Sequence, residues 1–232
     1  MDENRIFTAG EAETGTALIL VDENSSENSI LVTPGACACF TPEDVAQAGD
    51  VLEGADILLT QLETNLDVLP AVLAAFRRTG GTAILNPAPA REIPPELLSG
   101  FDIITPNEVE ASILSGVAVD SPASAEKAAD VFIGMGVKTV IITMGRAGVF
   151  IKDACRGGRF IGAFIVDALD TTGAGDAFNG AFAAALAGGT AVDDAARYGC
   201  AAAALSVTRI GTAPAMARKN EIEDFLLRQN DC

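Results

Sequence analysis

Residues 170–180 read Asp170-Thr171-Thr172-Gly173-Ala174-Gly175-Asp176-Ala177-Phe178-Asn179-Gly180. The pattern of the flanking sequence indicates that the rest of the chain supports this stretch. An apolar run at 160–166 precedes it and an Ala-rich run at 177–187 follows, which predicts a strand, a turn and a buried helix. Glycines at a helix start let a ligand approach the backbone, and the unpaired amides of the first turn attract an anion. Asp176 beside such a site indicates a general base. A helix-capping Asp is the alternative, and the short glycine motif alone does not choose between the two.

The composition predicts one acidic domain with a sizeable core. The chain has 232 residues, 49% of them hydrophobic, and its 32 acidic and 15 basic residues give a formal net charge of −17. This charge argues against nucleic acid or an anionic membrane as a partner. No apolar run approaches the roughly 18 residues of a membrane span. The polar start, Met1–Asn4, is not typical of a signal peptide.

The cysteines and the lack of histidine restrict the chemistry. Five cysteines show no paired spacing, which favours reduced thiols in a cytoplasmic protein. Without histidine, a mixed Cys/His zinc site and a serine-hydrolase triad are excluded. Carboxylates are therefore left to carry any proton transfer.

Alternating strands and helices are predicted along most of the chain. Two β-branched runs, 16–21 and 29–33, are joined by a polar turn and predict a hairpin, and Thr41-Pro42-Glu43-Asp44 is typical of a helix start. Further strands are expected at residues 56–60, 82–86, 101–105, 138–143, 148–152 and 159–166. Further helices are expected at residues 66–79, 94–98, 108–115, 123–135, 177–187, 191–207 and 221–228.

Four of the strand-like runs, ADILLT, TAILN, FDIIT and TVIIT, are short and almost continuously apolar. Strands buried on both faces of a parallel sheet have this pattern, so we expect a three-layer α/β/α fold with a mostly parallel sheet, plus a small β-hairpin near the N-terminus. Ligands bind at the carboxyl ends of such strands. Polar or glycine-containing segments follow the strands at 61–63, 87–89, 106–110, 144–148 and 170–176, which predicts an active-site rim there.

Several motifs, in order and at plausible spacing, resemble the ribokinase-like (PfkB) family of carbohydrate kinases. They include QLET, ILNPAPARE, DIITPNEVEA, VIITMGRAG, DTTGAGDAFNGAF and AAAALSVTRIG. The resemblance implies a single ribokinase-like domain over residues 1–232, with a lid hairpin at about 15–35 and an α/β core at about 36–232. It also implies cytoplasmic, ATP- and Mg²⁺-dependent phosphorylation of the primary hydroxyl of a small sugar, with D-ribose foremost. Fructose, a keto-sugar acid or a nucleoside are alternative substrates, and nucleotide binding without turnover is an alternative function.

The same resemblance implies roles for individual residues. Asp176 matches the catalytic base, and Glu63 matches a sugar contact, with a solvated loop acid as its alternative. The turn that holds the transferred phosphoryl group matches Gly173, Ala174 and Gly175. The nucleotide site matches Asn107, Thr143, Met144, Gly145, Arg146, Ala147, Gly148, Gly175, Asp176 and Cys200. A monovalent-cation site for K⁺ matches Asp170, Thr172, Ser206, Arg209, Gly211 and Ala215.

Some positions leave the interpretation open. Asn107 and Glu110 match a family pair that organises Mg²⁺, but without the resemblance a helix-capping pair is the preferred interpretation. Arg146 stands where the family often has a small polar residue. Cys200 stands where it often has Asn, so contacts to the nucleotide at these two positions are in question.

The front of the chain departs from the family pattern. Family members begin with a core strand that carries a sugar-binding Asp, followed by a GGKGxN segment, and neither motif is found here. We therefore expect a portion of more than ~30 residues, the size of a βαβ unit, to be missing, and the strands beside it to be unpaired. On this interpretation the chain by itself phosphorylates ribose weakly or not at all. The lid hairpin is also a candidate homodimer contact.

Overall fold

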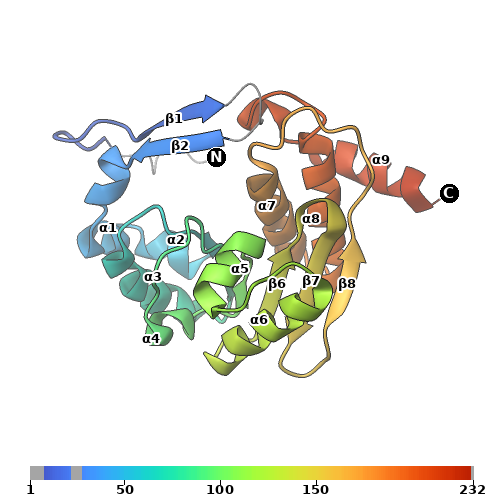
Figure 1. The fold of residues 1–232 in the computed structure, drawn as a ribbon. Coiled ribbons are helices and arrows are strands. Elements are labelled where there is room, and N and C mark those ends of the chain that lie inside the picture. Colours follow the sequence, from blue (N-terminus) through green and yellow to red (C-terminus); the bar gives the residue numbers. More distant parts are fainter. Residues whose placement is uncertain (1–7, 22–27, 231–232) are drawn as a thin grey trace.

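A computed structural model describes residues 8–21 and 28–230 (Figure 1). Its strands are β1 (Thr16–Val21), β2 (Asn28–Thr33), β3 (Ile57–Thr60), β4 (Thr82–Leu85), β5 (Ile103–Ile104), β6 (Thr139–Thr143), β7 (Gly148–Asp153) and β8 (Arg159–Gly162). Its α-helices are α1 (Pro42–Gln47), α2 (Gly49–Glu53), α3 (Leu69–Phe76), α4 (Pro95–Leu98), α5 (Glu108–Ser115), α6 (Pro122–Gly134), α7 (Ala174–Ala187), α8 (Val192–Ser206) and α9 (Lys219–Asn230).

A six-stranded mixed sheet forms the centre of the molecule, in the order β3-β4-β5-β6-β7-β8. The pairs from β3 to β6 are parallel, and β6–β7 and β7–β8 are antiparallel. The antiparallel end follows from the connection after β6, since the short turn Met144–Ala147 is far too short for the crossover that parallel strands require. The predicted three-layer fold is confirmed, with this antiparallel end added to its parallel strands.

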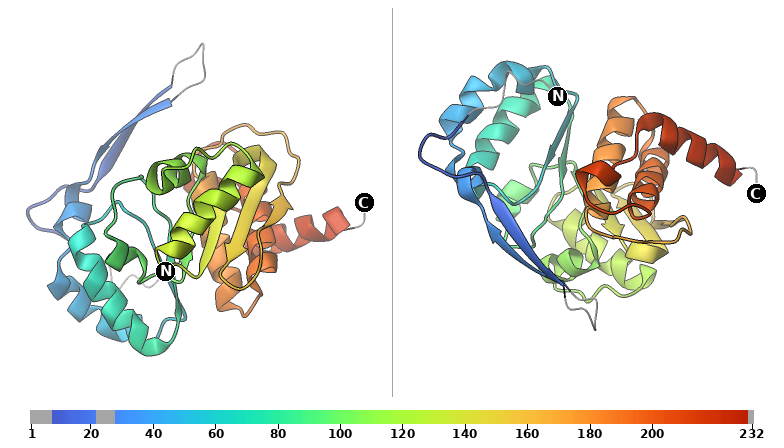
Figure 2. Two further views of the ribbon diagram at one scale, coloured as in Figure 1. Left: turned by 60° about the horizontal axis from the view of Figure 1, so that its bottom comes forward. Right: turned by 90° about the horizontal axis from the view of Figure 1, so that it is seen from above.

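Alternate strand residues enter two separate cores, one on each face of the sheet. Leu85, Ile104 and Ile142 pack with α3, α5 and α6 on one face. Ile84, Ile103 and Ile141 pack on the other face against α7 and α8. Figure 1 and the two further views in Figure 2 show these helix layers on opposite sides of the sheet. Burial on both faces explains why the strands are almost continuously apolar in sequence.

Most element boundaries agree with the sequence pattern. Thr41 caps α1 through a capping box with Asp44, and α5 spans the predicted residues 108–115. The helix expected at 66–79 is α3 with a 3₁₀ turn at each end. The strand expected to reach residue 166 stops at Gly162, because Gly162 lies opposite Gly148, the first residue of β7, and the pairing ends with the Ala163 amide, which donates to the Ala147 carbonyl of the turn. Helix α2 was not predicted.

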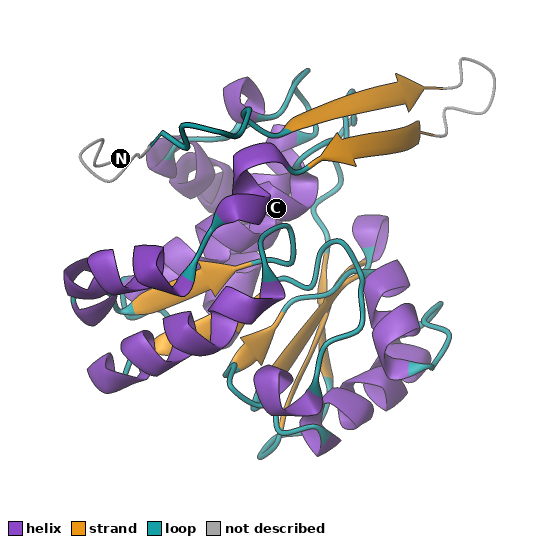
Figure 3. Ribbon diagram, turned by 90° about the vertical axis from the view of Figure 1, so that its left-hand side faces the viewer, coloured by secondary structure: helices purple, strands orange, loops and turns teal. Residues whose placement is uncertain are grey.

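The hairpin β1–β2 lies apart from the sheet, as Figure 3 shows. Its strands are antiparallel, with Thr16 opposite Thr33. The described side chains on it are exposed, including Leu18 at 58% and Leu31 at 62%. The 3₁₀ turn Gly35–Cys39 leads from the hairpin to the core. The predicted hairpin is confirmed; its turn at 22–27, the N-terminal residues 1–7 and Cys232 lie outside the described residues.

Strand β3 forms one end of the six-stranded sheet in the described part of the chain. Its Leu59 side chain is 38% exposed, as is typical of an end strand, and Phe160 on β8 at the opposite end is 41% exposed. No described helix combines the length and the apolar character needed to cross a bilayer.

Candidate active site

The carboxyl ends of the parallel strands meet the first turn of α7 at a cavity of about 280 Å³. The cavity is lined by Leu59, Thr60, Gln61, Asn86, Asp176, Asn179 and Gly180. Asp176 is exposed at this cavity, as a base that must reach a substrate requires. The three amide side chains were not among the predicted site residues.

Helix α7 begins in a way that leaves two amides of its first turn open, although its first amide, that of Ala174, donates to the Thr171 carbonyl at 3.2 Å. Gly173 is its N-cap and has φ of 77°, a left-handed conformation that favours glycine, and no side chain caps the helix. Among the described residues, neither the Gly175 nor the Asp176 amide has a hydrogen-bond acceptor, whereas the Ala177 amide donates to the Gly173 carbonyl. The interpretation of Asp176 as a helix cap is therefore not supported by the structure. These open amides are the groups that bind an anion at a helix N-terminus.

A buried polar network lies beneath the first turn of α7. The Thr105 hydroxyl, on a residue only 1% exposed, donates to Asn179 Oδ1 at 2.6 Å. Asn179 Nδ2 in turn donates to the Gly175 carbonyl at 2.9 Å. From the other side, Asn86 Nδ2 donates to the Thr105 carbonyl at 2.8 Å. A polar Asn in the apolar helical run was the available sequence signal for this network.

The loop after β3 brings Glu63 toward the same cavity. Gln61, which lines the cavity, approaches Glu63 Oε2 with its Nε2 at 3.5 Å, and Glu63 is exposed. The loop is fixed to its surroundings because the Leu62 amide donates to the Ala88 carbonyl at 2.9 Å. Asn65 ties this loop to the turn below the hairpin, donating to the carbonyls of Ala38 and Phe40. The predicted base therefore lines the cavity, and the predicted sugar contact lies next to a lining residue without lining the cavity itself.

Asn107 and Glu110 form a capping box at the start of α5. The Asn107 side chain accepts from the Glu110 amide at 2.8 Å, and Glu110 Oε2 accepts from the Asn107 amide at 2.9 Å. Burial raises the pKa of the Glu110 carboxyl, and the bond from the Asn107 amide opposes this only in part. A bound cation would favour the charged form of such a carboxyl, and Glu110 Oε1 accepts no hydrogen bond from a described residue, so the pair fits Mg²⁺.

The predicted nucleotide turn lies beside this pair. Thr143 forms a parallel bridge with Asn107, and its amide donates to the Pro106 carbonyl at 2.9 Å. Within the turn, Met144 is buried and Arg146 is exposed. Gly148 has φ of 125°, and a Cβ there would come within 2.1 Å of the Ile161 carbonyl, so a side chain is excluded.

The predicted monovalent-cation residues come together in part. Asp170 accepts from the amides of Thr172 and Gly211, both at 2.9 Å, and so joins the loop before α7 to the loop after α8. The hydrogen bond from the Gly211 amide lowers the pKa of the Asp170 carboxyl most, and the hydrogen bond from the Thr172 amide lowers it further. The loop after α8 also packs on Gly173, the N-cap of α7, since a Cβ on Gly173 would lie 3.4 Å from Thr212 of that loop.

Other predicted residues are engaged elsewhere through their side chains. Ser206 donates to the Ala203 carbonyl of its own helix, and Arg209 pairs with Glu221 at 2.5 Å. Ala215 is buried. Cys200 is 7% exposed and packs in the core between α7, α8 and the sheet, where burial raises its thiol pKa to about 12. Direct contact between this thiol and a nucleotide would need access that the position does not offer.

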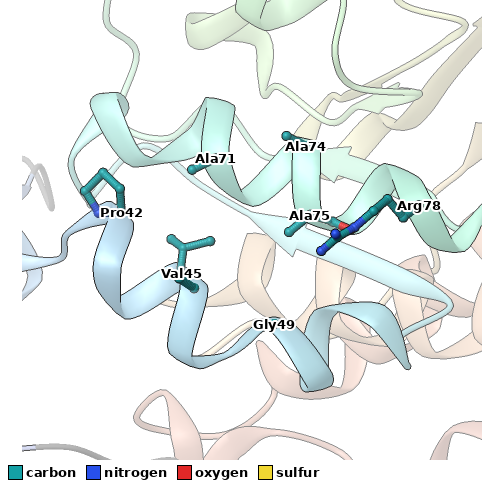
Figure 4. Close-up of a pocket in the computed structure, with 8 residues that line it drawn as sticks. Pro42, Val45, Gly49, Ala71, Ala74, Ala75 and Arg78 are labelled. Atoms are coloured by element: carbon teal, nitrogen blue, oxygen red, sulfur yellow. The ribbon is translucent and has the colours of Figure 1, made fainter.

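A larger groove of about 400 Å³ lies away from these residues, between α1–α2 and α3 (Figure 4). Small apolar side chains such as Val45, Ala71 and Ala74 line it. Its one charged side chain, Arg78, pairs with Glu53 at 2.6 Å. The groove therefore offers no group for proton transfer, and the smaller cavity at Asp176 is the candidate active site.

Comparison with known proteins defines the class of this chain. The model of the pfkB family of carbohydrate kinases matches residues 2–219. The chain therefore belongs to the pfkB family and is an ATP-dependent sugar kinase by class.

Individual proteins of this family are also similar to the chain. It is 44% identical to a ribokinase of Haemophilus influenzae and 39% identical to a ribokinase of Staphylococcus aureus. These matches cover 97% and 96% of this chain and 73% of each relative. Among solved structures, an Arabidopsis thaliana ribokinase complexed with ribose and ATP superposes with a TM-score of 0.85 at 28% identity, covering 93% of this chain and 70% of that one.

Proposed function

We propose that this chain transfers the γ-phosphoryl group of ATP to the primary hydroxyl of D-ribose, giving ribose 5-phosphate. The observation that carries the proposal is the start of α7, where the Gly175 and Asp176 amides have no acceptor among the described residues and the Asp176 carboxylate faces a cavity. The relatives named ribokinase, and the neighbour solved with ribose and ATP, support ribose as the sugar.

In the proposed reaction, Asp176 takes the proton from the attacking hydroxyl. The hydroxyl oxygen then bonds to the γ-phosphorus as the bond to the leaving ADP oxygen breaks. The open Gly175 and Asp176 amides of the Gly173–Asp176 turn stabilise the charge on the transferred group. Glu63 holds the sugar, and the Thr143–Gly148 turn holds the nucleotide.

Metal ions are assigned to two places. Asn107 and Glu110 would hold Mg²⁺, which supplies positive charge to the phosphates when bound. The loop joined by Asp170 and Gly211 would hold K⁺ beside the start of α7, with Thr172, Ser206, Arg209 and Ala215 contributing mainly through backbone atoms. Each assignment is supported by the position of its residues near the carboxyl ends of the strands.

We also propose that the core and the hairpin act as one ribokinase-like domain in the cytoplasm, and that the hairpin is a homodimer contact. The exposed Leu18 and Leu31 support the second point, because a lone two-stranded hairpin is only marginally stable in water. A second copy of the hairpin would cover these side chains.

The test is ADP formation with MgATP and a panel of sugars: D-ribose, 2-deoxyribose, D-fructose, a keto-sugar acid and a nucleoside. The expected result is that D-ribose gives the highest kcat/KM of the panel, even at the low absolute rate expected from the sequence. A higher kcat/KM for another sugar would contradict the choice of ribose and leave the kinase class intact.

Nucleotide binding without turnover is the second candidate. The position of β3 as an end strand beside Asp176 favours it, because a side without a neighbouring strand offers fewer contacts to orient a sugar hydroxyl for attack. Melting in the presence of millimolar MgATP separates the candidates, because a ligand of the native state adds RT ln(1 + [L]/Kd) to its stability. A raised Tm with no ADP formation for any sugar would favour this candidate, and no shift at all would contradict both.

A further inference from the structure

Helix α7 carries one buried polar side chain that the proposed chemistry leaves unused. Its other buried residues are Ala177, Phe178, Phe182 and Ala183, while Asn179 is 5% exposed. A buried amide is costly unless it is hydrogen-bonded, and an apolar residue here would join the core without that cost. The partners of Asn179 are therefore informative about why a polar side chain stands there.

Each partner of Asn179 is fixed by a different element. The Thr105 hydroxyl donates to Asn179 Oδ1. Thr105 itself is held by two hydrogen bonds: its backbone amide donates to the Leu85 carbonyl at 2.9 Å, and its carbonyl accepts from Asn86 Nδ2. These bonds leave Asn179 Nδ2 pointing at the Gly175 carbonyl. In a regular helix this carbonyl also accepts from the backbone amide of residue 179, so it receives two donors.

The Gly175 carbonyl and the Asp176 amide belong to one peptide group. A donor on the carbonyl fixes the orientation of that peptide plane and polarises it, which strengthens the N–H on its other side. That N–H is one of the two amides at the start of α7 that have no acceptor among the described residues. The bonds run in one direction, from the Thr105 hydroxyl through Asn179 to the Asp176 N–H.

We infer that Thr105 and Asn179 are positioning residues that aim and strengthen the Asp176 amide toward the group it binds. The inference rests on the proposed function, in which that group is the phosphoryl group in transfer. Because the charge to be stabilised is greatest in the transition state, losing this support lowers kcat and leaves the KM for MgATP little changed.

The test uses a matched pair at Thr105. Thr105→Val keeps the shape of the side chain and removes the donor, and Thr105→Ser keeps the donor. We expect Thr105→Val to lower kcat about tenfold, the rate equivalent of one hydrogen bond, with KM for MgATP within about twofold. Thr105→Ser should recover most of kcat. Ser115→Ala, which removes a hydroxyl bonded to the Ala111 carbonyl of its own helix, is the control and should leave kcat unchanged.

A second measurement reports on the peptide itself. In ¹⁵N-labelled protein without ligand, Thr105→Val should move the Asp176 amide proton to lower frequency, because a less polarised N–H resonates there, and Thr105→Ser and Ser115→Ala should not. Asn179→Ala should have the same effect, and adding Thr105→Val to it should cause no further change, because Thr105 acts through Asn179. An unmoved Asp176 signal in Thr105→Val, or additive effects in the double variant, would overturn the inference.

These two readouts also separate the inference from the proposed function. If the chain shows no turnover but Thr105→Val moves the Asp176 amide as described, the kinase proposal fails and the coupling stands. If the chain turns over and Thr105→Val retains full kcat, the kinase proposal stands and the coupling has no role in catalysis.

Discussion

Polar side chains are used in opposite ways at the two ends of the parallel strands, which we call the amino edge and the carboxyl edge of the sheet. At the amino edge, where the parallel strands begin, charges are satisfied by one another: Asp102 bonds to Arg77 at 2.8 Å and to Lys138 at 2.7 Å, and Asp153 bonds to Arg159 at 3.0 Å. At the carboxyl edge, Asp176, Glu63 and Arg146 are exposed and take part in no ion pair within residues 8–21 and 28–230. Charges paired within the protein favour stability, while charges left open are available to a ligand.

Strand β5 shows the same contrast over a very short distance. Asp102 precedes its two residues and Thr105 follows them. Asp102 accepts from the Ala83 amide and from two cations, whereas the hydroxyl of Thr105 starts a series of bonds that ends at an open amide. We therefore expect substitutions at the amino edge to change stability alone, and substitutions at the carboxyl edge to change turnover.

The largest effect is expected for Asp176→Asn. The substitution keeps the size of the side chain and removes the base, so kcat should fall by at least ~10². The unfolding free energy should stay within about 0.5 kcal/mol of the original, since Asp176 is exposed. Steady-state ADP formation and urea denaturation measure the two quantities. Near-full activity would remove Asp176 from its proposed role.

Asp102→Asn should have the opposite profile. Removing a nearly buried carboxylate that accepts charged hydrogen bonds should lower the unfolding free energy by about 2 kcal/mol, with kcat unchanged. Urea denaturation at neutral pH gives the first value. A fall in kcat without loss of stability would break the proposed division between the edges.

The pH dependence sharpens this prediction. Burial raises the pKa of Asp102, but the bonds from Lys138, the Ala83 amide and Arg77 outweigh it, so the pKa lies below its usual value. The stabilisation is therefore complete above the pKa of the unfolded chain, about 3.9, and is lost as the pH falls through the lower pKa of the folded protein. The difference in stability between the original chain and Asp102→Asn should accordingly narrow below about pH 4.

A smaller effect is expected from K⁺ at the carboxyl edge. Replacing K⁺ by a large organic cation at equal ionic strength should reduce ADP formation about fivefold, the lower end of typical coupling between sites. In Asp170→Asn the two salts should give similar rates, since the loop loses the charge that joins it to Gly211. Equal rates in both salts for the original chain would rule out a functional cation site.

The smallest effect is expected for Lys138→Gln. Lys138 is 73% exposed, and exposed ion pairs contribute little, so the loss in unfolding free energy should be about 0.5 kcal/mol or less. Adding salt should weaken even this difference. A loss as large as that of Asp102→Asn would mean that Lys138 alone supports the carboxylate.

The sequence predicted what depends on local pattern or on one continuous motif. The cap at Thr41 and the bounds of α5 are set by neighbouring residues, and the two-sided burial of the strands is visible in their apolar runs. The bond between Thr105 and Asn179 joins residues 74 apart, and no periodicity indicates such a pair. The end of β8 depends on where its partner strand begins, and α2, a five-residue helix starting at Gly49, has no side-chain cap to signal it.

The different surroundings of the thiols make selective chemical labelling practical. Cys200 is buried, and its high pKa leaves almost no thiolate at neutral pH, so a maleimide should react with it very slowly. Cys37 and Cys39 are exposed on the turn between the hairpin and the core. After the exposed Cys155, the C-terminal Cys232 and one of this pair are replaced by Ser, a single fluorophore on the remaining thiol would sit at the joint between hairpin and core. Because Asn65 bonds to the Ala38 and Phe40 carbonyls of this turn, the emission of the dye could report whether substrate binding at the loop after β3 reaches the hairpin.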